Sequence, residues 1–336
     1  MRLGVLDVGS NTVHLLVVDA HHGGHPMPQT SVKSVLRLAE QMDERGKITR
    51  EGADHLIRTV RDAVESAYAM GCEDVMAFAT SAMRDASNSV AVLNRVQAET
   101  GVELEILSGE QEAILTFLAV RRWCGWSAGR ILMVDIGGGS LEIASGIDEE
   151  PDVAVSLPLG AGRLTRSWLT NDPPRRRELE NLREHIAEQL EEPARKLREI
   201  GTPDRVVGTS KTIRSLARLS GAAPSSAGPR VRRTLSDAGL RQVIDFISRM
   251  SADDLAELEG VSASRSHQLV AGALVAQAAM RALGVDGLDL CPWALREGVI
   301  LRRLDWLDWM DGIDRTAQPK RRPPRRAGRT VPPGAR

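Results

Sequence analysis

Two stretches of the chain repeat the same order of apolar and polar positions. Residues 3–17 read LGVLDVGSNTVHLLV, and residues 131–145 read ILMVDIGGGSLEIAS. Each copy has an apolar run, an aspartate, a turn with glycine, a hydroxyl residue and a second apolar run. One strand–turn–strand pattern is ordinary for a β-hairpin, but two copies with the same Asp-x-Gly-x-x-(Ser/Thr) spacing predict an internal duplication.

Strand and helix patterns alternate through the rest of the chain. Between the two copies, the apolar periodicity predicts helices at residues 48–69, 90–100 and about 110–123, and strands at residues 74–79 and 102–106. After the second copy it predicts strands at residues 153–157 and 205–207, and helices at residues 175–199, 212–219, 236–250 and 267–283. This alternation is typical of α/β domains, in which helices cover the faces of a sheet.

Length and composition fit a globular protein of two domains. A chain of 336 residues exceeds the usual size of one core, so we expect domains at residues 1–125 and 126–295, each opened by one copy of the repeat. A hydrophobic content of 42% with 26% charged residues excludes disorder of the whole chain. The three cysteines lie far apart, which excludes a disulfide framework and a CxxC metal site and indicates a reducing compartment.

The sequence predicts a cytoplasmic protein without a membrane segment. Asp7 lies where a secretory signal would need its apolar stretch. No apolar run approaches the roughly 18 residues of a membrane-spanning helix.

Charge is distributed unevenly along the chain. Residues 315–336 contain eight of the 44 basic residues and no acidic residue, so residues 1–314 hold 36 basic against 45 acidic residues, a formal charge of −9. The Pro/Arg-rich tail at 315–336 cannot bury a core, and we expect it to be disordered. A role of this tail as a cationic tether for polyanions, nucleic acid included, is an alternative that we favour less than a solvated terminus.

The two glycine turns are candidates for phosphate binding. A glycine directly after a strand lets backbone N–H groups approach a ligand without a Cβ in the way. An aspartate at the strand end, Asp7 in one copy and Asp135 in the other, provides oxygen ligands for Mg²⁺. The alternative is a pair of plain hairpins. Three consecutive glycines at 137–139 argue against it, because they weaken a hairpin that has no ligand.

Further segments carry chemistry only if the fold places them near these turns. Ser108 and Gln111 fit a capping box that begins a helix, while Glu110 and Glu112 near the positive helix end fit a base that activates water. The loop at 208–212 (GTSKT) follows a strand and opens a helix, as phosphate-binding turns do, but it is not a Walker A loop. A capped helix with a solvated lysine explains it equally well. A histidine-rich stretch at 21–25 reads as a solvated loop.

Taken in order, these motifs resemble the bacterial exopolyphosphatase/guanosine pentaphosphate phosphohydrolase (Ppx/GppA) family. The resemblance covers nearly all of residues 3–303 and rests on DVGSNT (7–12), TSAMRDASN (80–88), SGEQEA (108–113), DIGGGSLE (135–142), PLGAGRLT (158–165), GTSKT (208–212) and LREG (295–298). It implies a duplicated, ribonuclease-H-like α/β fold of the actin/Hsp70/sugar kinase superfamily, with a cleft between two domains. It also implies a helix at about 296–309 that returns to the N-terminal domain.

The resemblance assigns roles to residues at the matching positions. Glu112 matches the catalytic glutamate that activates water, and Glu110 occupies a more variable position. Asp135 and Glu142, with Asp7, match the acids associated with Mg²⁺. The expected phosphate-binding residues are Gly9, Ser10, Asn11, Thr12, Arg84, Gly137, Gly138, Gly139, Ser140, Arg163, Gly208, Ser210, Lys211 and Thr212.

Two positions depart from the family pattern. Lys211 stands where many members have glycine, and His267 stands where an acid is common. Lys211 adds a cation to its loop. With histidine at position 267, the sequence does not decide whether this position contacts a metal ion or a phosphate.

The function implied by the resemblance is a Mg²⁺-dependent exopolyphosphatase acting on inorganic polyphosphate, with a homodimer and nucleotide inhibitors as further expectations. The charge of −9 over residues 1–314 and the few basic residues in the motifs predict a preference for short chains. A guanosine pentaphosphate 5′-phosphohydrolase would use the same residues. A sugar or acetate kinase shares the fold class. A nucleotide-sensing protein with little turnover is an alternative of another kind.

Overall fold

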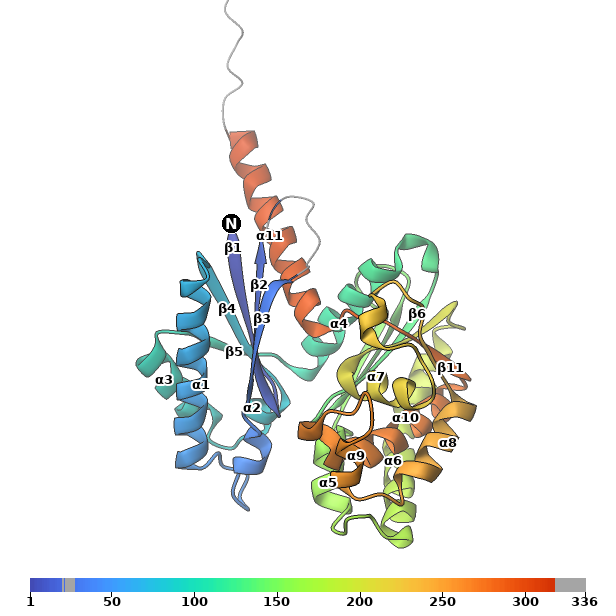
Figure 1. The fold of residues 1–336 in the computed structure, drawn as a ribbon. Coiled ribbons are helices and arrows are strands. Elements are labelled where there is room, and N and C mark those ends of the chain that lie inside the picture. The colour runs from blue at the N-terminus through green and yellow to red at the C-terminus, as the bar shows by residue number, and fades with distance from the viewer. Residues whose placement is uncertain (20, 22–27, 318–336) are drawn as a thin grey trace, which may run out of the picture.

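A computed structural model of the chain describes residues 1–19, 21 and 28–317. It has two α/β halves side by side, with the last helix running back along the first half (Figure 1). Most of the histidine-rich stretch at 21–25 and the tail residues 318–336 lie outside the described residues.

The first half is built on a five-stranded sheet in the order β3-β2-β1-β4-β5. Its strands are β1 (Arg2–Val8), β2 (Thr12–Asp19), β3 (Pro28–Val35), β4 (Asp74–Ala79) and β5 (Leu104–Ile106). The first three strands form an antiparallel meander, whereas β4 and β5 run parallel to β1. The helices of this half are α1 (Arg50–Ala69), α2 (Ser81–Asp85) and α3 (Ser89–Thr100), with a short 3₁₀ helix at Leu38–Gln41.

The second half has a six-stranded sheet in the order β10-β11-β9-β6-β7-β8. Its strands are β6 (Ile131–Ile136), β7 (Leu141–Gly146), β8 (Val153–Leu157), β9 (Arg205–Gly208), β10 (Thr234–Ser236) and β11 (Gly287–Leu290). Its helices are α5 (Ala161–Trp168), α6 (Arg176–Glu199), α7 (Ser210–Leu219), α8 (Asp237–Ile247), α9 (Ala252–Ala256) and α10 (Leu269–Leu283). Short 3₁₀ helices lie at Trp126–Ala128, Ser225–Ala227 and Ala263–Gln268.

The two sheets repeat one topology, which confirms the duplication predicted from the sequence. In each half an antiparallel three-stranded meander is followed by a strand that pairs in parallel with the first strand, β4 with β1 and β9 with β6. A third parallel strand follows outside it, β5 in one half and β11 in the other. Only the antiparallel strand β10 extends the second sheet beyond this plan. The fold is therefore the expected duplicated α/β architecture.

Local sequence signals explain where the helices begin. The Thr49 side chain accepts a hydrogen bond from the backbone N–H of Gly52 at 3.1 Å, which caps α1 at its N-terminus. The expected helix at 267–283 begins slightly later, at Leu269, because residues 263–268 form a 3₁₀ turn. The strands β3, β10 and β11 were not among the predicted elements. β11 has only four residues, too few for a clear alternation of polar and apolar positions.

Two helices connect the halves. α4 (Gly109–Cys124) follows β5 of the first sheet but places Phe117 in a core cluster with Ile131 and Met133 of the second sheet. α11 (Leu295–Ala317) starts after β11 and contributes Val299 and Ile300 to a cluster with the outer face of β1 and β2.

Within α11, Gly298 lies so close to the carbonyl oxygen of Leu115 in α4 that no Cβ would fit. The helix continues through Ala317, so residues 315–317, which we expected to belong to the disordered tail, are helical. No proline, which would interrupt a helix, occurs between Leu295 and Ala317. None of the helices formed by the described residues meets the length and apolarity that crossing a membrane requires.

Candidate active site

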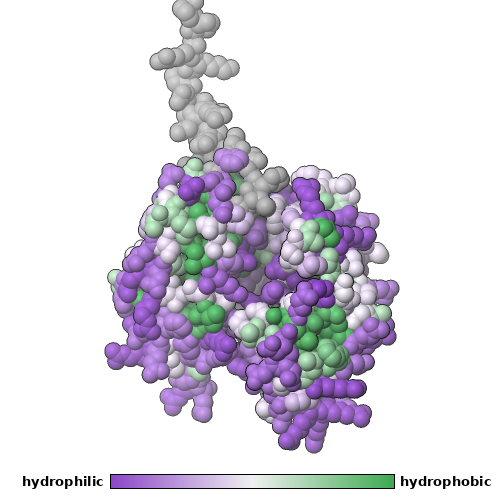
Figure 2. Space-filling model, in the orientation of Figure 1, coloured by the Kyte–Doolittle hydropathy of each residue, from purple (hydrophilic) through white to green (hydrophobic). Residues whose placement is uncertain are grey.

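The two glycine turns face each other across a cleft between the halves. A cavity of about 180 Å³ lies there, and Figure 2 shows mainly hydrophilic residues around the hollow between the two halves. Among the expected site residues, its lining includes Asp7, Gly9, Ser10, Asn11, Thr12, Glu112, Asp135, Gly137, Gly138, Ser140, Glu142, Ser210 and Lys211. Segments more than 200 residues apart in the chain thus form one site.

The turns of the two copies have the same hydrogen-bond geometry. The backbone N–H of Gly9 donates to the Thr12 carbonyl at 3.0 Å, and the N–H of Gly137 donates to the Ser140 carbonyl at 2.9 Å. A Cβ at Gly138 would lie 3.0 Å from the amide nitrogen of Asn11 in the opposite turn. A side chain at Gly138 would force the Asn11 side chain to shift, because the two turns approach each other closely, which a plain hairpin would not need.

A second glycine supports the 137–140 turn from behind. A Cβ on Gly160, at the start of α5, would overlap the backbone of Gly139 and Ser140. The sequence motif PLGAGRLT contains this glycine, but its packing role could not be read from the sequence.

Glu112 is held at the start of α4 with its side chain directed into the cleft. The capping box is present: the Ser108 hydroxyl accepts from the N–H of Gln111 at 3.1 Å, and the Gln111 side chain accepts from the N–H of Ser108 at 2.7 Å. These two residues satisfy the helix end, so Glu112 is not needed for capping. Glu112 is buried, with 7% of its surface exposed, whereas Glu110 is exposed and does not line the cavity.

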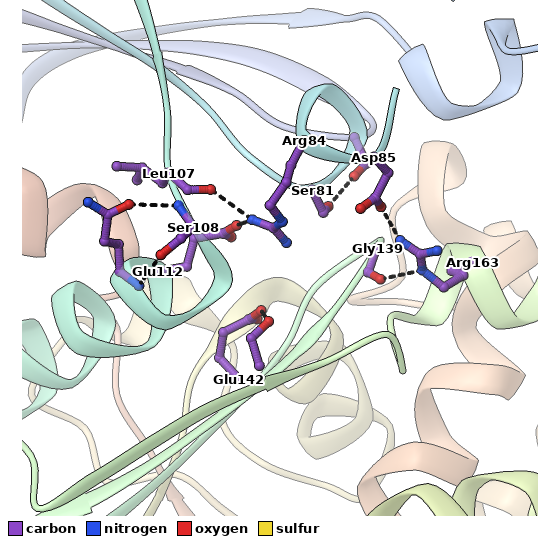
Figure 3. Close-up of polar contacts among 12 residues, drawn as sticks. Ser81, Arg84, Asp85, Leu107, Ser108, Glu112, Gly139, Glu142 and Arg163 are labelled. Atoms are coloured by element: carbon purple, nitrogen blue, oxygen red, sulfur yellow. Dashed lines mark hydrogen bonds and ion pairs between the residues drawn. The ribbon is translucent and has the colours of Figure 1, made fainter. Parts of the chain in front are cut away.

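Burial and charge give Glu112 an unusual ionisation. Burial raises the pKa of Glu112; Arg84 lowers it, the nearby Asp7 and Asp135 add smaller increases, and the net pKa is about 7. Figure 3 shows Arg84 reaching from α2 to Glu112; its Nη1 forms an ion pair with Oε1 of Glu112 and donates to the Leu107 carbonyl at 2.9 Å. A carboxyl group with this pKa is poised to exchange a proton near neutral pH.

Three further acids lie at equivalent ends of the two hairpins. Asp7 and Asp135 are the second-last residues of β1 and β6, and Asp135 pairs across the hairpin with Glu142 of β7. Desolvation raises the pKa of Asp135 to about 6 and raises the pKa values of Asp7 and Glu142. The Ser156 hydroxyl donates to Oε1 of Glu142 at 2.9 Å and fixes its orientation.

These carboxylates fit a Mg²⁺ ion that also binds substrate. Within the described residues, no three acidic, histidine or cysteine side chains converge closely enough to hold a metal alone. Mg²⁺ usually takes one or two carboxylates and completes its octahedron with water and phosphate oxygens. Acids whose pKa values are raised by burial and by one another gain stability when a cation enters between them.

The expected phosphate-binding arginines are placed differently from each other. Arg84 contacts Glu112, whereas Arg163 of α5 forms an ion pair with Asp85 and donates through Nε to the Gly139 carbonyl at 2.7 Å (Figure 3). Arg163 therefore links the second glycine turn to α2 of the first half. Neither arginine belongs to the cavity lining, and neither do Gly139, Gly208 or Thr212.

Gly208 and Thr212 lie in packed surroundings. A Cβ at Gly208 would come within 2.9 Å of Ile213, and Thr212 is buried against Gly272 of α10. Ser210 does line the cavity and has a left-handed backbone with φ of 76°, which is rare for a residue other than glycine. Such strain is concentrated at functional sites.

Sequence reasoning gave no role to two cations of the cavity, Arg265 and Arg296. Arg296 lies 4.0 Å from Asp7, measured from Nε to Oδ2, and Arg265 has a buried Nε without a hydrogen-bond partner among the described residues. Arg296 belongs to the LREG motif (295–298), which could have indicated a role for it in the site. No motif quoted from the sequence contains Arg265. His267 lies outside the lining, with Nε2 3.9 Å from Glu40, and burial lowers its pKa.

Comparisons with known proteins agree on one family. The sequence model described as the Ppx/GppA phosphatase family matches residues 17–306. The protein named Exopolyphosphatase 1 of Mycobacterium tuberculosis is 67% identical over 305 residues, which cover 91% of this chain and 89% of the relative. A protein of Vibrio parahaemolyticus named guanosine-5′-triphosphate,3′-diphosphate pyrophosphatase is 27% identical over 93% of this chain and 61% of its own length.

Solved structures show the same fold. A crystal structure of an exopolyphosphatase from Cytophaga hutchinsonii superposes with a TM-score of 0.82 at 24% identity, covering 91% of this chain and 98% of that one. A Ppx/GppA phosphatase from Aquifex aeolicus gives a TM-score of 0.70 at 25% identity over 90% of this chain and 99% of that one.

Proposed function

Because the chain belongs to the Ppx/GppA phosphatase family, we propose that it is an exopolyphosphatase, which releases orthophosphate from the ends of inorganic polyphosphate. The identity of 67% to proteins named Exopolyphosphatase 1 favours this activity within the family. One structural observation carries the proposal: Glu112, with a pKa of about 7, lies buried in a cavity between two glycine turns.

In the proposed mechanism the two turns hold the terminal phosphates. The backbone N–H groups after Gly9 and Gly137 and the hydroxyls of Thr12 and Ser140 are donors for phosphate oxygens. Phosphoryl transfer depends mainly on positioning and on neutralising charge, so a preformed set of donors contributes much of the rate.

Glu112 acts as the base for the attacking water. A base is most effective when its pKa lies near the working pH. In the free enzyme Arg84 is bound to Glu112, and an arriving phosphate dianion competes for the same guanidinium. Transfer of Arg84 to the phosphate would leave the Glu112 carboxylate free to orient and deprotonate water.

Asp135 and Glu142, with Asp7, would hold Mg²⁺. The ion would neutralise charge on the phosphate oxygens. Its ligands are presented by strand ends whose register is fixed by the β6–β7 hairpin. A cytoplasmic homodimer, sensitive to nucleotides and selective for short chains, completes the proposal.

Guanosine pentaphosphate is the second candidate substrate, because a relative named for that activity aligns over 93% of this chain. The deciding experiment measures orthophosphate release from tripolyphosphate, longer polyphosphates and guanosine pentaphosphate, with and without Mg²⁺. Release from polyphosphate that depends on Mg²⁺ supports the proposal. Release from guanosine pentaphosphate alone, or tight nucleotide binding without turnover, would replace it.

A further inference from the structure

A second cavity adjoins the active site. It has a volume of about 350 Å³ and shares Lys211 and Arg214 with the catalytic cavity, so these two residues form the boundary between the two spaces. Beyond them its wall is made largely by small residues of the loop after α7, among them Ala222 and Ala223. We call this space the side pocket.

The side pocket is lined by more cations than acids. It contains the cations Lys211, Arg214, Arg218 and Arg233 and a single acid, Glu259, whose carboxylate is paired with Arg218 at 2.8 Å. Among the described residues, the three other cations have no ion pair. Arg233 donates only to backbone carbonyls, and Arg214 donates to the Pro292 carbonyl at 3.3 Å.

Lys211 differs from the arginines of Figure 3. Arg84 and Arg163 already have polar partners, whereas no hydrogen bond or ion pair engages the ammonium group of Lys211 within the part of the chain that the structure describes. Partial burial lowers the pKa of Lys211, and the neighbouring cations Arg214, Arg265 and Lys33 lower it further. Arg214 and Arg265 also face Asp135 in the catalytic cavity, and an anion in the side pocket would offset the remaining repulsion among the cations.

The backbone at this boundary is also strained. Ser210, directly before Lys211, holds its left-handed conformation at the first residue of α7. This conformation places the start of α7 and the Lys211 side chain at the junction of the two cavities. The helix end alone would not define a site, but the unpartnered cations supply an independent reason for one.

We propose that Lys211 and Arg214 open a distal polyphosphate subsite in the side pocket, which binds the phosphates of the retained chain beyond those held by the glycine turns. This inference rests on the proposed function, since it concerns the same substrate in the same enzyme. It makes Lys211 a determinant of chain length: a substrate too short to pass the boundary gains nothing from it. Residues 1–314 have a formal charge of −9, so this local cluster holds only a few phosphates beyond the glycine turns, in agreement with the proposed preference for short chains.

Kinetics with substrates of defined length test the subsite. Lys211→Gln should raise KM about 3- to 10-fold more for chains longer than tetraphosphate than for tripolyphosphate, as expected for the loss of one exposed charged contact that only the longer chains use in full. Lys211→Arg should restore the wild-type value, and Lys196→Gln on the exposed face of α6 is the matched control.

A second variant tests the side pocket without changing any charged residue. Ala223→Phe fills the side pocket, and it should likewise raise KM for the longer chains only. Dissociation constants measured by calorimetry in a Glu112→Gln background give the same comparison without turnover, so the subsite is tested even if activity is low.

Equal effects of Lys211→Gln on short and long chains, or no effect on either, would overturn the subsite and leave the hydrolase proposal intact. The proposed function itself fails if the unmodified enzyme releases phosphate from no polyphosphate.

Discussion

Replacing Arg84 by methionine should shift the pH dependence of activity. In the free enzyme Arg84 lowers the pKa of Glu112, which burial and the neighbouring acids raise to about 7. A base acts when it is deprotonated, so kcat/KM should increase with pH through about 7. Removing the guanidinium takes away the cation that stabilises the carboxylate, and the pKa should therefore rise.

The size of the shift follows from the geometry. An adjacent opposite charge typically changes a carboxyl pKa by about 1–3 units. Arg84 contacts Glu112 directly, and the exposed fractions of the two side chains are 25% and 9%, so screening by water is limited. We expect the acidic limb of the kcat/KM profile to move from near 7 to about 8 or above in Arg84→Met. The absolute rate should also fall, because the substrate loses a cation.

The assay is the initial rate of phosphate release from tripolyphosphate at fixed Mg²⁺ across the pH range. Arg163→Met is the matched control: Arg163 is also an expected phosphate contact, but its partners are Asp85 and Gly139. Arg163→Met should lower kcat/KM at every pH without moving the acidic limb of the pH profile. Ionisation of the substrate affects the profiles of Arg84→Met and Arg163→Met equally, so it cannot produce a difference between them. An Arg84→Met profile that is lower but unshifted would refute the role of Arg84 in setting the pKa of Glu112.

Three other variants test separate parts of the site. Glu112→Gln should lower kcat by roughly 10²–10⁴-fold with binding retained, and Glu110→Gln should remain near wild type; the reverse result would show that the wrong glutamate was assigned. Asp135→Asn should raise the Mg²⁺ concentration needed for half-maximal rate. Mg²⁺ should raise the Tm of the wild type more at about pH 8 than at about pH 6, because protons compete for the carboxylates near their raised pKa values; a pH-independent Mg²⁺ effect would contradict the metal assignment. Gly160→Ala should destabilise the protein by about 1–3 kcal/mol and raise KM, since its Cβ meets backbone at Gly139, and an unchanged Tm would contradict this packing.

The local parts of this protein followed from its sequence. The spacing of Asp7 and Asp135 from their glycines predicted two equivalent hairpins, because a turn and its flanking strands are set by neighbouring residues. The capping box at Ser108 correctly predicted the start of α4, since capping is decided within one turn of helix. The family motifs added the expected roles of Glu112, Arg84 and the Mg²⁺ acids, which stay predictions for this chain.

The tertiary structure alone decided how these parts combine. Glu112 and Asp135 lie on different elements, and only the packing of α4 against the second sheet brings Glu112 into the cleft with the strand-end acids. The burial that raises the pKa of Glu112 depends on that packing, so no local pattern contains it. The same holds for Arg265, which reaches the cavity from a 3₁₀ turn without any sequence signal. Sequence periodicity reports which face of an element is buried, but the contacts across the cleft depend on how separate elements pack against one another.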